Sequence, residues 1–66
     1  MFTVEWLKEG RPIHRESMLG AKLGDTLRLA HSLTTTAKEA SGVEPDAVRV
    51  TDHMTNRTVV EKIANA

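Results

Sequence analysis

The side chains best suited to metal binding in this sequence are three histidines, because the chain contains no cysteine. Imidazoles that share a metal ion on a helix typically recur four residues apart, as in H-E-x-x-H. His14, His31 and His53 fit no such spacing and fall on three different predicted elements. The sequence therefore predicts no metal site.

The adjacent residues Asp52 and His53 form the one pair that suggests acid–base catalysis. A serine hydrolase would also need a nucleophile, and Ser17, Ser32 and Ser41 stand in no nucleophile-elbow sequence. Asp52 also begins a run typical of a turn, in which an aspartate side chain bonds to nearby backbone groups. We therefore assign Asp52 to the turn, expect no catalytic residue and interpret the chain as a non-enzyme.

Two glycines, Gly20 and Gly24, precede a predicted helix, as glycines do in phosphate-binding loops. The P-loop spacing is missing, and Asp25 already places at the helix start the negative charge that a phosphate would bring. Asp25 is better interpreted as the N-cap of the helix. We expect no bound cofactor.

Nine basic and nine acidic residues give the 66-residue chain a formal net charge of zero, with both signs mixed along it. No segment has the basic character typical of nucleic-acid or lipid binding. An apolar content of 39% with balanced charge favours a folded domain over a disordered chain. No apolar run approaches the roughly 20 residues that span a bilayer, and no secretory signal is recognisable. The expected location is the cytoplasm, away from membranes.

Alternation of apolar and polar residues predicts four strands. Residues 2–7 and 47–52 alternate clearly, and residues 57–63 form the last strand. Residues 13–18 alternate poorly, which suggests an edge strand. The last two strands are expected to form a hairpin with a loop of four or five residues.

A period of 3.6 residues predicts one helix over about 25–41. Residues 20–24 connect it to the preceding strand, and Gly42 occupies the left-handed position that often ends a helix. Residues 34–36 are three threonines with low helix propensity, so packing must hold this helix. Residues 64–66 are expected to fray.

These elements predict a single α+β domain over residues 1–66 with the order ββαββ. An antiparallel sheet of three to four strands carries one helix packed on one face. The core is expected from Phe2, Val4, Trp6, Val48 and Val50 of the sheet and from Leu27, Ala30, Leu33 and Ala37 of the helix. The opposite sheet face is expected to carry Thr3, Glu5, Arg49 and Thr51, with some of Arg57, Val59 and Glu61.

Two segments resemble known families. The sequence from Gly24 to Ala30 resembles the helix entry of small antitoxin domains of the HicB type, in which strands precede the helix. The sequence from Asp46 to Asp52, followed by residues 56–60, resembles the terminal hairpin of small uncharacterised bacterial domains with a strand–helix–hairpin plan. This second resemblance implies a bacterial source and a similar fold, and it implies no activity and no site residues.

A small core and the exposed edges of a small sheet favour a non-enzymatic protein-interaction module, either as a homodimer or docked on a larger partner. Its surface is expected from three basic and two apolar side chains: Arg15, Arg49, Arg57, Val59 and Met54. A nucleic-acid-binding or antitoxin-like regulator is the alternative, with the three arginines on one surface. Acidic residues expected among them favour cross-strand ion pairs instead.

Overall fold

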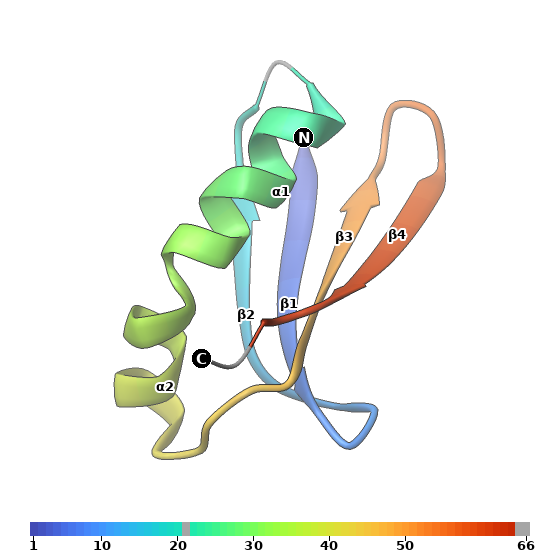
Figure 1. Cartoon of the computed structure of the whole chain (residues 1–66). Helices are drawn as coiled ribbons and strands as arrows, with labels where there is room; N and C mark the ends of the chain where they lie inside the picture. The colour runs from blue at the N-terminus through green and yellow to red at the C-terminus, as the bar shows by residue number, and fades with distance from the viewer. Residues whose placement is uncertain (21, 65–66) are drawn as a thin grey trace.

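The computed structural model describes residues 1–20 and 22–64, which form strands and helices in the order ββααββ. The strands are β1 (Phe2–Lys8), β2 (Arg11–Met18), β3 (Ala47–Asp52) and β4 (Arg57–Lys62), and the helices are α1 (Leu23–Ser32) and α2 (Thr34–Ser41). The strands make one antiparallel sheet in the order β2-β1-β3-β4, and both helices lie on the same face of it (Figure 1). The α+β class is thus confirmed. Ala21 of the expected connector and residues 65–66 of the expected frayed end lie outside the described residues.

The prediction of one helix was wrong, because α1 and α2 meet at a break at Leu33. Leu33 has φ −96° and ψ 11°, and its N–H is shared between the carbonyls of Leu29 and Ala30. The Ala30 carbonyl also accepts a hydrogen bond from the indole N–H of Trp6 at 3.1 Å, so the buried Trp6 of β1 engages a helix carbonyl at the break. The three threonines that follow have low helix propensity, so they do little to keep the helix continuous across Leu33. Periodicity missed it because both helices continue the same apolar stripe.

The start of α1 also differs from the prediction, whereas the end of α2 agrees with it. The N-cap is Lys22 rather than Asp25, and within the described residues it makes no side-chain capping bond. Asp25 lies in the first turn, where it pairs with Arg28 and its charge favours the helix dipole. Gly42 ends α2 in the left-handed conformation at φ 75°, as expected.

The two hairpins set the positions of the strands. Glu9 and Gly10 join β1 to β2 with φ values of 52° and 79°, and positive values at both positions are typical of a type I′ turn. This turn is tighter than expected, so β2 begins at Arg11 and includes Pro12. As expected, β2 is an edge strand. A four-residue loop, 53–56, joins β3 to β4.

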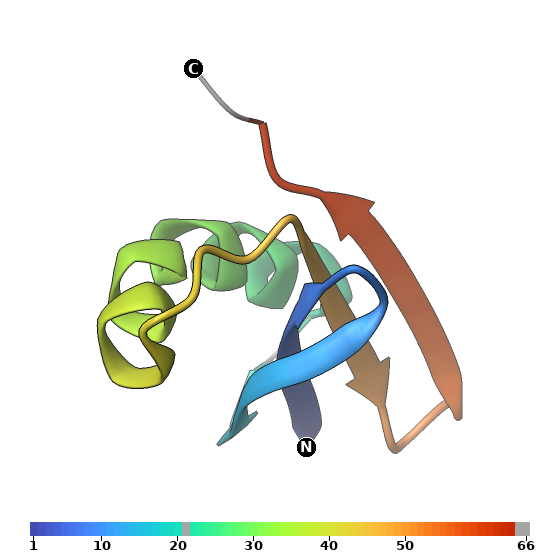
Figure 2. The same ribbon diagram turned by 90° about the horizontal axis from the view of Figure 1, so that it is seen from below.

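The core lies between the helices and the two central strands. Val4, Trp6, Val48 and Val50 are fully buried on the helix-facing side of the sheet. The remaining members of the core and the residues packed against it are Phe2, Ala30, Ala37, Ile13, Met18, Leu23, Leu27, Leu33 and Ile63. The helices cover β1, β2 and β3, and β4 extends past them (Figure 2). β4 is therefore the strand that the helices cover least.

Within the described residues, neither helix has the length and apolar character that crossing a membrane requires.

Candidate functional site

The outer face of the sheet, on the side opposite α1 and α2, carries an ion-pair cluster across three strands. The register places Glu5 opposite Arg15 on β2 and opposite Arg49 on β3. Arg49 Nε donates to Glu5 Oε1 at 2.8 Å, and Arg15 donates from a terminal guanidinium nitrogen to Glu5 Oε2 at 3.3 Å. The expected cross-strand pairing on this face is thus observed for these three residues.

The two arginines of this cluster contribute unequally. Glu5 is only 7% exposed, and its pKa is lowered chiefly by the hydrogen bond from Arg49, against the opposing effect of desolvation, with a further contribution from Arg15. The same hydrogen bond raises the pKa of Arg49. The Arg49 side chain is 32% exposed and that of Arg15 is 69% exposed. Arg49 is therefore the main partner of Glu5, while Arg15 lies largely in solvent.

The structure does not bring the five predicted surface residues together. Arg57 lies opposite Asp52, and Val59 lies opposite Val50. Because paired residues share a face, Arg57 and Val59 are on the helix-facing side of the sheet, away from Arg49. Met54 is 85% exposed in the loop between β3 and β4. The expectation that Arg57 and Val59 share the outer face with Arg49 was wrong.

Glu61 likewise belongs to the helix-facing side. The register places Glu61 opposite Val48, and its carboxylate accepts a hydrogen bond from His31 Nε2 of α1 at 2.9 Å. The sequence misplaced Glu61 because the strand period gives alternation alone, and a shift of one residue in pairing exchanges the two faces.

The edge strand β4, at the other side of the sheet from β2, is its most exposed strand. Among the described strands it pairs with β3 alone, and most of its residues are exposed. Val59 on the helix-facing side is partly buried, and Val60 on the outer face is 56% exposed. Two adjacent valines thus present apolar surface on both faces of one edge strand.

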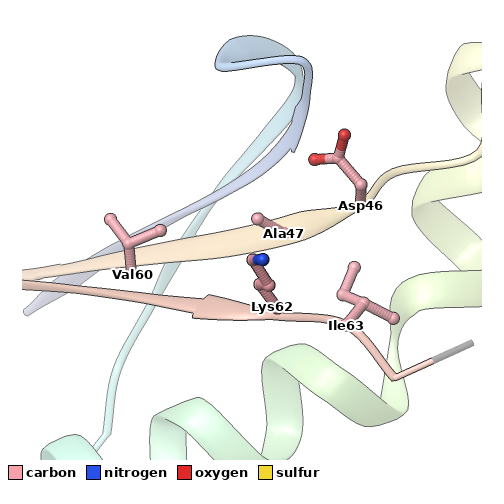
Figure 3. Close-up of a pocket in the computed structure, with 5 residues that line it drawn as sticks. All are labelled: Asp46, Ala47, Val60, Lys62 and Ile63. Atoms are coloured by element: carbon pink, nitrogen blue, oxygen red, sulfur yellow. The ribbon is translucent and has the colours of Figure 1, made fainter.

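A shallow depression of about 440 Å³ lies where β4 ends beside the start of β3 (Figure 3). It is lined by Asp46, Ala47, Val60, Lys62 and Ile63. Val60 of β4 contributes apolar surface to the lining, and Lys62 and Asp46 contribute opposite charges. Sequence reasoning did not single out this hollow, because its residues meet only through the pairing of β3 with β4.

Asp52 and His53, the pair considered for acid–base catalysis, bond to different partners. Asp52 accepts the Met54 N–H at 2.9 Å and the Thr55 hydroxyl at 3.0 Å, which confirms its turn role. Desolvation acts to raise the pKa of Asp52, but the hydrogen bonds from Thr55 and Met54 outweigh it and the pKa is lowered. His53 instead shares a hydrogen bond with Thr3 at 2.7 Å. Among the described residues, no group of three His, Cys, Asp or Glu side chains is arranged to hold a metal ion.

Comparisons of the chain with protein-family models, with curated proteins and with solved structures gave no match.

Proposed function

We propose that the chain is a non-enzymatic protein-interaction module whose contact element is β4, and that it acts mainly through self-association. The observation that carries this proposal is the position of β4. It is the strand that the helices cover least, pairs with β3 alone among the described strands, and presents Val59 and Val60 on its two faces. The unpaired backbone groups of such a strand are a template for one more strand.

The two edges of the sheet differ in a way that favours β4 over β2. The β2 edge contains Pro12, which has no N–H to donate, and a bulge interrupts its pairing with β1 between Trp6 and Leu7. Proline and bulges are the features by which natural sheets block pairing at an edge. β4 has the sequence R-T-V-V-E-K, which contains no proline, and its register with β3 runs without a bulge. This asymmetry supports β4 as the side on which a partner adds.

Nucleic-acid binding has less support from the positions of the arginines. Arg15 and Arg49 both contact the buried carboxylate of Glu5, and Arg57 lies on the other face of the sheet. A phosphate backbone is bound by positive charges that line one surface and lose their counterions on binding. In a gel-shift experiment at low salt with mixed DNA and RNA, we expect no shift.

The proposed function is tested by sedimentation equilibrium from micromolar to millimolar concentration, together with amide NMR spectra over the same range. We expect the mass to rise toward that of a dimer and the concentration-dependent shifts to cluster in β4. Amides of β2 serve as the internal control and are expected not to move. A monomer at millimolar concentration with unchanged β4 amides would overturn self-association.

A further inference from the structure

We infer that β4 pairs antiparallel with β4 of a second copy of this chain, in the register that sets the two Val59 residues opposite each other. The inference rests on the proposed function and adds to it the partner and the geometry. The pairing joins two four-stranded sheets into one sheet twice as wide. It also closes the exposed edge on both copies.

The charge pattern of β4 is self-complementary about Val59. Two residues on either side of Val59 are Arg57 and Glu61. In an antiparallel pair centred on Val59, Arg57 therefore faces Glu61 of the second copy, and Glu61 faces Arg57 of the second copy. Opposite charges set directly across from each other in this way stabilise a strand pair.

Side-chain alternation places this charge arrangement on the helix-facing side of the joined sheet. Arg57, Val59 and Glu61 share that face within one copy. Residues paired across strands share a face, so the helix layers of both copies lie on the same side of the joined sheet. Because the helices pack mainly on β1 to β3, β4 and its neighbour can occupy the space between the two helix layers (Figure 2).

A hydrogen bond within each copy already orients Glu61. His31 Nε2 of α1 donates to Glu61 Oε1 at 2.9 Å. The other carboxylate oxygen has no such bond among the described residues, so it is available to Arg57 of the second copy. The charge pairs would thus form without first breaking the contact that ties β4 to α1.

Neighbouring registers lose this complementarity. If the strand pair is centred on Val60, Arg57 lies opposite Ile63 of the second copy and Glu61 lies opposite Val59, so neither charge faces an opposite charge. A pairing of Val59 with Val60 of the second copy sets Arg57 against Lys62 of the second copy, twice. It also places the helix layers on opposite sides of the sheet. Of these registers, only the centre at Val59 pairs opposite charges along β4.

Disulfide trapping tests the register, because the chain has no cysteine of its own. In the proposed pair, the two Cα atoms at position 59 are about 4.5–5.5 Å apart, within the roughly 4.4–6.8 Å range of disulfides. The Cα atoms at position 60 are about 8 Å apart, from two residues of offset and one strand spacing. We therefore expect Val59→Cys to form covalent dimers under mild oxidation at least about ten-fold faster than Val60→Cys, the matched control.

The opposite order of rates, or equal slow rates, would overturn the register. Sedimentation of both variants in reducing buffer keeps this result separate from the proposed function. If the reduced variants dimerise but Val59→Cys is not trapped preferentially, the register fails and self-association stands. If they are monomeric at millimolar concentration, both fail.

A charge exchange provides an independent test. Arg57→Glu and Glu61→Arg each create two like-charge contacts in a homodimer, and we expect each to weaken self-association by on the order of ten-fold or more. Mixed in equal amounts, the two variants restore both opposite pairs, so we expect a heterodimer that is as stable as the unmodified dimer. Lys62→Ala, on the outer face, is the matched control and should leave dimerisation unchanged.

Failure of the mixture to form the heterodimer, with both variants folded as shown by the buried Trp6 signal, would overturn the inference. Should Arg57→Glu unfold, because Asp52 lies opposite it, the trapping experiment decides the register by itself.

Discussion

Replacing Glu5 by glutamine tests whether the ion-pair cluster stabilises the sheet. The substitution keeps the size of the side chain and removes the charge that Arg49 and Arg15 share. A hydrogen bond to a charged group contributes about 1.5–3 kcal/mol, which applies to the 2.8 Å bond from the half-buried Arg49. An exposed pair contributes about 0–1 kcal/mol, which applies to Arg15. Because the amide oxygen still accepts one bond, we expect Glu5→Gln to cost about 2 kcal/mol.

The assay is urea unfolding followed by the fluorescence of Trp6. This indole is fully buried and donates to Ala30, so its emission reports loss of the core. A loss of about 2 kcal/mol corresponds to a fall in Tm of about 8–16 °C in a domain of this size. Glu44→Gln, which removes an exposed carboxylate that lies 3.9 Å from Lys38 and away from β4, is the matched control and should cost less than about 0.5 kcal/mol.

Replacing each arginine in turn, and measuring how stability depends on pH, shows which contact of Glu5 provides the stabilisation. We expect Arg49→Met to cost about 2 kcal/mol and Arg15→Met less than about 1 kcal/mol. The folded-state pKa of Glu5 lies below its ordinary value of 4.5, so its contribution is complete above that pH and is lost as the pH falls through the folded pKa. Stability should fall as the pH decreases below about 4.5, and less steeply in Glu5→Gln. Equal costs for both arginines, or an unchanged pH slope in Glu5→Gln, would refute this reasoning.

Three further substitutions are read out by the free energy of unfolding in urea. Glu9→Asn should stabilise the chain by about 0.5 kcal/mol, because asparagine tolerates φ 52° in a type I′ turn better than glutamate; a loss would contradict that turn. Gly20→Ala should cost about 1–3 kcal/mol, because the added Cβ would lie 2.5 Å from Thr26 Oγ1 and 3.2 Å from the Phe2 ring. Gly24→Ala is its control, because a Cβ added at Gly24 meets no described atom within 4 Å. Thr34→Val should stabilise by about 1 kcal/mol, because the Thr34 hydroxyl is buried without a partner among the described residues, and Thr34→Ser should not.

The core was predictable because burial imposes a period on the sequence. Phe2, Val4 and Trp6 alternate with polar residues, and this pattern identified the covered face of β1 before any pairing was known. The same pattern weakens in β2, whose beginning at Arg11 depends on the two-residue turn at Glu9 and Gly10. Positive φ at a glutamate is uncommon, so the sequence favoured a longer turn than the one observed.

The candidate site was only partly predictable, for a different reason. Arg49 and Glu5 were expected on the outer face, and their ion pair is observed. Val59 and Arg57 were expected with them, but the four-residue loop sets a pairing of β4 that turns both toward the helix side. The adjacent valines of β4 show no alternation, so nothing in the strand itself indicates which one faces the core.

By itself, the sequence determined the α+β class, the approximate location of the strands and the apolar stripe of the helical segment, since each depends on the spacing of residues along one element. Only the tertiary structure decided the break at Leu33 and the face on which each β4 side chain lies. The break depends on a bond from Trp6, remote in the sequence, and the faces depend on the register between strands. Both are relations between elements, and a pattern within one element does not contain them.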